Sequence, residues 1–211
     1  MSLPLLVGFS GKKNSGKDTL ALYLKDRLEK ERHFLISITG FGVPLKKAIH
    51  KFFEIPLELL FGSYEDKCEP THLLWDDMSG YHGLSGHMSI REVLQYFGTD
   101  IMRRLHSDVW CNALYDEIST VHKNSHLVFL VDERFPNEVV WTKNHGGYVI
   151  RLTRTTDGSD LHESETALDN YSGFDAIIDN NKLTLEDTKE MAYNIVSKIL
   201  ENYRLVDTYI P

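Results

Sequence analysis

A glycine-rich loop near the start of the chain places the strongest constraint on the fold. Residues 11–19 read Gly-Lys-Lys-Asn-Ser-Gly-Lys-Asp-Thr and match the pattern G-x-x-x-x-G-K. The run Leu3–Phe9 before the loop is continuously apolar, which is typical of a strand buried on both faces of a parallel sheet. Leucines among charged residues predict a helix over Asp18–Arg32. Strand, glycine loop and helix in this order predict a parallel α/β unit that binds phosphate at the loop.

The loop has the residue types that a triphosphate requires. Its glycines allow successive N–H groups to point inward as an anion site, and the dipole of the following helix adds to it. Lys17 would reach the β- and γ-phosphates. The residues expected to bind the triphosphate are Gly11, Lys13, Asn14, Ser15, Gly16, Lys17, Asp18 and Thr19.

Asp18 occupies the position at which the usual pattern has a serine or threonine. That hydroxyl normally binds Mg²⁺. The Asp18 carboxylate could hold the ion directly or through water, or Thr19 could replace it. The alternative is that Asp18 only caps the helix, and the sequence leaves both interpretations open.

Strands and helices alternate along the rest of the chain, which predicts a three-layer α/β fold with a parallel sheet. The expected strands are 34–38, 127–131, 148–152 and 176–178, and the expected helices are 44–53, 89–97, 108–122, 136–144 and 185–203. The capping-box pair Ser89 and Glu92 begins the second of these helices, and Gly98 is expected to end it. We expect one domain over residues 1–211, with an irregular insertion around 62–88 and a lid around 153–173.

Composition excludes several classes of protein. The formal net charge of -8 argues against binding to a nucleic acid polymer. No run approaches the roughly 20 apolar residues of a membrane span. Two distant cysteines, Cys68 and Cys111, fit a reducing compartment, so we expect a cytoplasmic protein.

A second charged cluster, Asp132–Glu138, follows the apolar run Leu127–Val131. Ligands of open α/β sheets bind beyond the carboxyl ends of the strands. Asp132 is therefore placed to orient Mg²⁺ or its waters, and Arg134 could clamp a phosphate with two parallel hydrogen bonds. The same residues also suit a helix start with Pro136 in its first turn. For Glu133 we favour a structural role.

Taken together, these motifs resemble the deoxynucleoside monophosphate kinases of bacteriophages and some bacteria. The shared segments are GKKNSGKDT, Pro44-Leu45-Lys46, Asp66-Lys67 before Pro70, Ser89–Asp100, Asp132–Glu138, Gly146-Gly147, His162–Glu165 and Ile178-Asp179-Asn180. They span almost the whole chain in order. The block from Arg91 through Gln95 to Asp100, together with Asp132–Glu138, is more specific than the glycine loop.

The resemblance implies a P-loop kinase fold with a five-stranded parallel sheet, ATP and Mg²⁺ as ligands, and a lid over the reacting phosphates. It implies an acceptor site formed by Lys46, Lys67, Arg91, Gln95 and Arg134, and a base contact from Asn180. The metal would be held by Asp18, Thr19 and Asp132. The sequence leaves open whether the protein forms a homodimer.

The lid segment departs from those of lid-rich small kinases. Residues 155–173 contain no lysine or arginine and several acids. Arg154, which precedes them, is the candidate for stabilising charge on the transferred phosphoryl group. Arg151 alternates with apolar residues and is expected to be structural. For Glu165 a helix-capping role is favoured over contact with the acceptor or the metal.

The expected activity is transfer of the γ-phosphoryl group of ATP to a deoxynucleoside monophosphate, with Lys17, Arg134 and Arg154 as catalytic residues. Animal-type phosphomevalonate kinases show similar motifs and form one alternative. A nucleotide-binding module that has lost transfer forms another.

Overall fold

The computed structural model describes residues 3–78, 83–155 and 162–203. The chain divides into two compact units. The sheet unit comprises residues 1–41 and 115–211, and the helical unit comprises residues 42–114. Each is described by itself, and a single domain over the whole chain stays a prediction.

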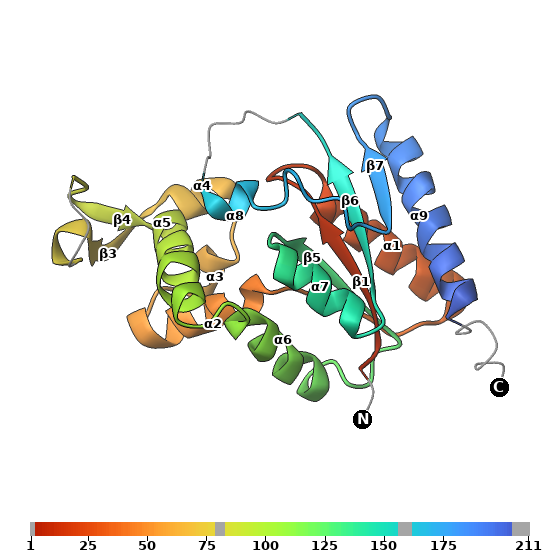
Figure 1. Ribbon diagram of the computed structural model, residues 1–211, viewed down its shortest axis with the longest axis horizontal. Helices are drawn as coiled ribbons and strands as arrows, with labels where there is room; N and C mark the ends of the chain where they lie inside the picture. The colour runs from red at the N-terminus through yellow and green to blue at the C-terminus, as the bar shows by residue number, and fades with distance from the viewer. Residues whose placement is uncertain (1–2, 79–82, 156–161, 204–211) are drawn as a thin grey trace. The chain divides into compact units, whose positions relative to one another are not determined.

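Among the described residues, one five-stranded sheet forms the centre of the sheet unit (Figure 1). Its strands, in spatial order, are β2 (Ile36–Thr39), β5 (Leu127–Glu133), β1 (Leu5–Ser10), β6 (Tyr148–Thr153) and β7 (Ala176–Asp179). Every neighbouring pair is parallel. This confirms the expected five-stranded parallel sheet. All six residues of β1 are buried, as the continuous apolar run predicts for a central strand.

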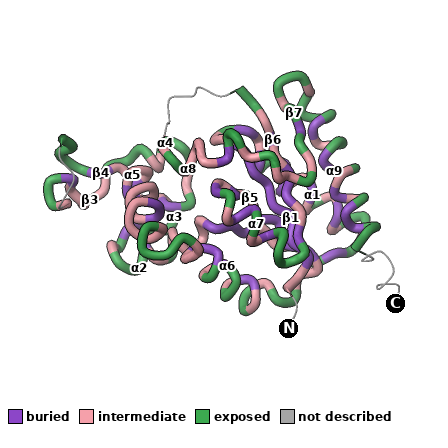
Figure 2. The backbone as a smooth tube through the Cα atoms, in the orientation of Figure 1, coloured by how far each residue is buried: buried purple, intermediate pink, exposed green. Residues whose placement is uncertain are grey.

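Helices cover both faces of the sheet. On one face, α1 (Lys17–Arg32) and α9 (Leu185–Asn202) pack in the cluster that contains Val7 and Phe9 of β1. On the other face, Val139 of α7 (Pro136–Asn144) contacts Val149 of β6. Figure 2 shows the central strands as the most continuously buried part of this unit. The three-layer prediction is therefore confirmed.

The parallel arrangement brings the carboxyl ends of the strands to one edge of the sheet. The glycine loop follows β1, and Arg134 follows β5. Arg154 follows β6, and Asn180 follows β7. Residues distant in sequence thus come to the same edge, which is where ligands of such sheets bind.

The helical unit is built from short elements. They are α2 (Gly42–Phe53), α3 (Leu57–Leu60), α4 (Tyr64–Cys68), β3 (Pro70–Leu74), η1 (Trp75–Asp77), β4 (His87–Ser89), α5 (Ile90–Gln95) and η2 (Tyr96–Arg103), followed by α6 (Val109–Thr120) across the boundary between the units. Strands β3 and β4 pair antiparallel. The insertion expected around 62–88 is not irregular over its described residues, which form α4, β3, η1 and β4. Elements of three to five residues are too short to show a period in the sequence.

The expected helix end at Gly98 was also wrong. The backbone stays helical through Arg103 as the π-helix η2. A side chain at Gly98 would place its Cβ 2.7 Å from Leu45 Cδ2, and the Gly98 carbonyl accepts a hydrogen bond of 3.0 Å from Trp110 Nε1. Gly98 is therefore explained by close packing inside a helix. Within the described residues, no helix is both long and apolar enough to cross a membrane.

Candidate active site

The glycine loop connects the end of β1 at Ser10 to the start of α1 at Lys17. Asn14, with φ of 59°, and Gly16, with φ of 97°, are both left-handed. The second position favours glycine because a Cβ is strained there. Ser15 between them is fully buried, whereas Asn14 is exposed. Alternation of left-handed residues in a tight loop is the backbone geometry of an anion nest.

The side chain of Lys17 folds back into the loop. Its Nζ donates hydrogen bonds to the Gly11 carbonyl at 2.8 Å and to the Lys12 carbonyl at 2.9 Å, and only 5% of the residue is exposed. Burial, helped by the nearby Arg134 guanidinium, lowers the pKa of Lys17 to about 8. The loop carbonyls hold the ammonium at the position from which it would reach a phosphate.

Arg134 is held by the segment that includes α8 (Glu163–Thr166). Its guanidinium donates to the Glu165 carboxylate and, at 3.4 Å, to the Ser164 carbonyl. Burial alone would lower the pKa of Arg134, but the Glu165 and Asp132 carboxylates outweigh it and raise the pKa. Arg134 therefore stays charged at any working pH.

Glu165 also contacts the glycine loop. The backbone N–H of Lys13 donates to Glu165 Oε2 at 3.3 Å. One carboxylate thus accepts from a loop amide and from Arg134, two donors that the sequence assigns to phosphate groups. These contacts of Glu165 differ from the helix-capping role that we expected for it.

A second acid from the same segment pairs with two further cations. Asp169 lies 2.8 Å from Lys12 Nζ and 3.7 Å from Arg151. Arg151 also donates to Ser10 Oγ at 2.8 Å, and Ser10 Oγ donates to the Glu133 carbonyl at 2.9 Å. These contacts tie β1, β5 and β6 together at their carboxyl ends, in line with a structural role for Arg151.

The predicted metal ligands lie at the same edge. Asp132 Oδ1 accepts a hydrogen bond of 2.7 Å from the backbone N–H of Phe41, and Asp18 and Thr19 are exposed. In the described part of the chain, no three acids, histidines or cysteines form a metal cluster. Mg²⁺ is usually bound by one or two carboxylates plus substrate phosphates, so this donor set fits the ion. Its binding stays a prediction.

Glu133 is fully buried, with its carboxylate next to Gly8 of β1 and Thr142 of α7. Thr142 Oγ1 donates to Glu133 Oε1 at 2.8 Å, while Oε2 has no partner among the residues that the structure describes. Burial raises the pKa of this carboxyl well above its ordinary value. Its position beneath the sheet edge agrees with the structural role that we favoured.

Asn180 contacts the loop itself. Its Nδ2 donates to the Ser15 carbonyl at 2.8 Å, and its Oδ1 accepts from Thr188 Oγ1 at 2.7 Å. Thr188 on α9 is buried. The predicted contact of Asn180 with the base of ATP stays a prediction.

The predicted acceptor residues of the helical unit gather around residues 61–67. Lys46 of α2 lies 4.4 Å from the centre of the Phe61 ring, and Arg91 of α5 lies 5.8 Å from that of Tyr64. Lys67 of α4 donates to the Gly62 carbonyl at 2.8 Å.

Gln95 is one turn after Arg91 on α5, so the two share a helix face. The capping box of Ser89 and Glu92 fixes the start of this helix, as predicted. The structure therefore brings Lys46, Lys67 and Arg91 to the segment of residues 61–67. Gln95 lies one helical turn from Arg91.

Arg154 and the lid are described only in part. Arg154 is exposed and makes no hydrogen bond or ion pair with the residues that the structure describes. The lid predicted over residues 153–173 includes residues 156–161, which lie outside the described residues. The catalytic role of Arg154 stays a prediction.

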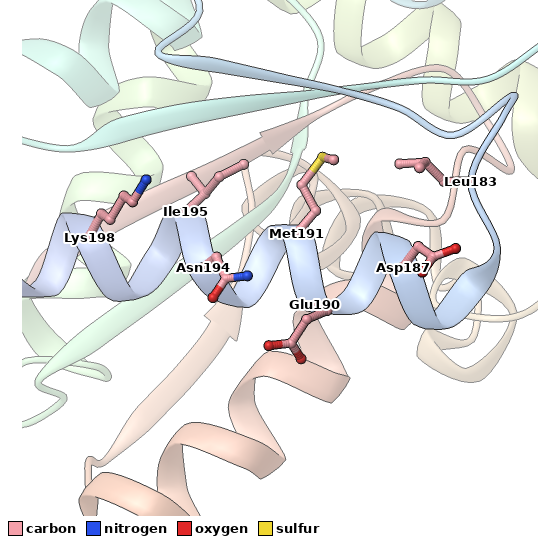
Figure 3. Close-up of a pocket in the computed structure, with 7 residues that line it drawn as sticks. All are labelled: Leu183, Asp187, Glu190, Met191, Asn194, Ile195 and Lys198. Carbon is pink, nitrogen blue, oxygen red and sulfur yellow. The ribbon is translucent and has the colours of Figure 1, made fainter.

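A surface pocket of the sheet unit lies away from these residues. Figure 3 shows Met191, Ile195 and Lys198 on one side of α9, and every residue that lines the pocket falls between Leu183 and Lys198. None of the predicted site residues contributes to it, so we do not assign the phosphate site there.

Sequence reasoning missed the internal partners of the predicted cations. Glu165, Asp169, Thr188, Phe61 and Tyr64 were not chosen as site residues. The one available signal was the excess of acids without lysine or arginine over residues 155–173, which indicates that basic groups elsewhere balance them.

Comparison with known proteins places the chain among nucleotide kinases. A family model described as deoxynucleotide monophosphate kinase matches residues 74–191. A curated protein of Acanthamoeba polyphaga mimivirus, named provisionally as a deoxynucleotide monophosphate kinase, is 35% identical over 195 residues, covering 87% of this chain and 91% of its own length.

Solved structures of small kinases show a weaker likeness. An APS kinase from Mycobacterium tuberculosis aligns over 94% of this chain and 99% of its own at 11% identity and a TM-score of 0.42. A shikimate kinase from Bacteroides thetaiotaomicron aligns over 93% and 98% at 13% identity and a TM-score of 0.46. The fold assignment rests on the sheet itself. Because the family model covers more than half of the chain and the viral relative matches most of it, this chain belongs to the deoxynucleotide monophosphate kinase family.

Proposed function

We propose that this protein transfers the γ-phosphoryl group of ATP to a deoxynucleoside monophosphate, forming a deoxynucleoside diphosphate and ADP. Membership of the kinase family supports the reaction. The observation that carries the proposal is the Lys17 ammonium, buried in a glycine loop at the carboxyl edge of a parallel sheet. A cation fixed in that position serves to bind the donor phosphates.

The donor site works by exchange of partners. Lys17 gives up the carbonyls of Gly11 and Lys12 for phosphate oxygens. The N–H of Lys13 exchanges the Glu165 carboxylate for a donor phosphate, and Arg134 exchanges the same carboxylate for the phosphate of the acceptor. Because these donors are already in place and partly shielded from water, they need little reorganisation as charge develops on the transferred group.

The acceptor is already an anion, so the chain needs no general base. Arg91 and Arg134 would pair with its phosphate. Lys46 and Lys67 would add charge, and Gln95 would present an amide to the base or sugar. Arg154 would stabilise the transferring phosphoryl group. Asp18, Thr19 and Asp132 would hold Mg²⁺. When bound, the ion neutralises charge on the donor phosphates.

An acceptor panel tests the proposal. The purified protein is incubated with ATP, Mg²⁺ and each common deoxynucleoside monophosphate, the ribonucleotides and phosphomevalonate, and products are separated by ion-exchange chromatography. We expect ADP and a deoxynucleoside diphosphate in equal amounts, and loss of both on chelation of the metal.

Two results would contradict the proposal. Transfer to phosphomevalonate alone would favour the first alternative, and tight ATP binding with no transfer to any acceptor would favour a module that has lost activity. We further propose a cytoplasmic location, which the two free cysteines support. A homodimer stays a prediction.

A further inference from the structure

Asn180 is fixed by three hydrogen bonds at the end of β7. Its backbone N–H donates to the Thr153 carbonyl at 2.8 Å. Its Nδ2 donates to the Ser15 carbonyl at 2.8 Å, and its Oδ1 accepts from the buried Thr188 hydroxyl at 2.7 Å. A carbonyl only accepts, so the amino group must face Ser15 and the orientation of the amide is determined.

The bond to Ser15 fixes a peptide plane of the glycine loop. The described chain contains no cis peptide, and in a planar trans peptide the C=O and N–H groups point in opposite directions. Because Asn180 holds the Ser15 carbonyl on its own side, the N–H of Gly16 points to the other side. Gly16 is left-handed at φ of 97°, and glycine backbone is more permissive than that of any other residue, so a fixed partner restricts the motion of this peptide.

We infer that Asn180 is a positioning residue that holds the Ser15–Gly16 peptide so that the N–H of Gly16 faces the donor phosphates. The inference deepens the proposed function and rests on it for the identity of the donor. It assigns the contribution of Asn180 to the phosphate chain of the donor. The base of the nucleotide should therefore be irrelevant to it.

Thr188 extends the same arrangement to α9. Its hydroxyl is buried, with 4% of the residue exposed, and it holds the amide oxygen while the amide nitrogen holds the loop. A base contact would require this amide to turn outward and to break both bonds. Positioning and base contact are thus separate arrangements of one side chain, and ligands with and without a base distinguish them.

The experiment measures binding by calorimetry, in the presence of Mg²⁺, of ATP, GTP and inorganic triphosphate to the full chain. The variants are Asn180→Ala and the nearly isosteric Asn180→Asp. Asn181→Ala is the matched control, because Asn181 is exposed and its amide bonds Asp179 and the N–H of Thr155.

We expect Asn180→Ala to weaken all three ligands by the same factor of about five- to tenfold, the size of one hydrogen bond. Asn180→Asp should weaken them at least as much, because a carboxylate has no N–H and would face the Ser15 carbonyl. Asn181→Ala should bind all three like the wild type, and the ratio of ATP to GTP affinity should not change in any variant.

Three outcomes would overturn the inference. They are a loss confined to ATP with triphosphate unchanged, equal binding by all variants, and a wild-type protein that does not bind triphosphate. Failure of the proposed function looks different. The wild type would then bind triphosphate but phosphorylate no deoxynucleotide, and the comparison of variants would still decide the role of Asn180.

Thr188→Val provides a second, independent measurement. It keeps the shape of the side chain but removes the hydroxyl, whose single proton is shared between Asn180 Oδ1 at 2.7 Å and the Thr184 carbonyl at 2.9 Å. We expect a loss of about two- to threefold for all three ligands. Combined with Asn180→Ala it should add no further loss, because both act through one contact. Additive losses would overturn the inference, and thermal unfolding of each variant verifies that the fold is retained.

Discussion

Two groups of cations in this protein are held in different ways. In the sheet unit, Lys17 and Arg134 are bound by loop carbonyls and by the Glu165 carboxylate. In the helical unit, Lys46 and Arg91 lie over the rings of Phe61 and Tyr64, which are 47% and 48% exposed.

Lys17 is 5% exposed, whereas Arg134, Lys46 and Arg91 are half-buried. A buried cation needs polar partners, since an uncompensated buried charge is very costly. A cation near water can be oriented by an aromatic face, which contributes about 0.5–1 kcal/mol at an exposed site. We propose that Lys17 changes partners when phosphate binds, and that the rings of Phe61 and Tyr64 add to the contacts that orient Lys46 and Arg91. The predictions below test this contrast, beginning with the largest effect.

Removal of Lys17 should have the largest effect. We expect Lys17→Ala to lower kcat by roughly 10³-fold or more, because a preorganised charge at the donor phosphates is lost. Steady-state assays with ATP measure it, and the circular dichroism spectrum should stay that of the wild type. Lys25→Ala, on the same helix but paired with Glu29, is the matched control and should keep full activity. Activity retained by Lys17→Ala would reject the donor site.

Removal of Arg91 should affect the acceptor alone. We expect Arg91→Ala to lower kcat/KM for the deoxynucleotide by roughly 10²-fold, mainly through KM, while ATP binding is unchanged. Tyr64→Leu should cause a smaller loss of about threefold, because the ring only orients the guanidinium. Arg104→Ala, whose side chain is 76% exposed, serves as the control. Weaker ATP binding in Arg91→Ala would contradict separate roles for the two groups.

The donor side should also respond to pH. The pKa of Lys17 is lowered to about 8, so its charge is lost as the pH rises through that value. We expect kcat/KM for ATP, which reports the free enzyme, to fall about tenfold per pH unit above pH 8. Saturating ATP should protect kcat, because bound phosphate raises the pKa of Lys17. The residual activity of Lys17→Arg should lack this alkaline decline, and its persistence would assign the decline to another group.

Replacement of Glu165 should have the smallest effect, with opposite signs on two parameters. In Glu165→Gln the carboxylate no longer competes for Arg134 and the N–H of Lys13, so ATP should bind about threefold more tightly. The rate kcat should fall slightly, because Arg134 loses an orienting partner. Glu163→Gln in the same short helix is the control. Weaker ATP binding by Glu165→Gln would show that this acid supports the donor site directly.

Local sequence patterns were sufficient for the strands and for the loop. Leu3–Phe9 and Leu127–Val131 are continuous apolar runs, and such runs become central strands wherever a parallel sheet forms. The match of residues 11–17 to a phosphate-binding pattern predicted the loop, since the left-handed backbone at Gly16 strains any residue with a Cβ. Pro136 and the capping box at Ser89 fixed two helix starts for equally local reasons.

The partners of each charged side chain were decided by tertiary structure. No spacing in the sequence connects Glu165 to Arg134 or Asn180 to Ser15, because these pairs form only when β1, β5 and β7 align at one edge. The reason for a glycine at position 98 is also tertiary, because a Cβ there would be too close to Leu45 on another helix. The sequence by itself determined which residues could carry charge and where the backbone could bend. The packing of distant strands decided which of those charges meet, because contact in space depends on topology.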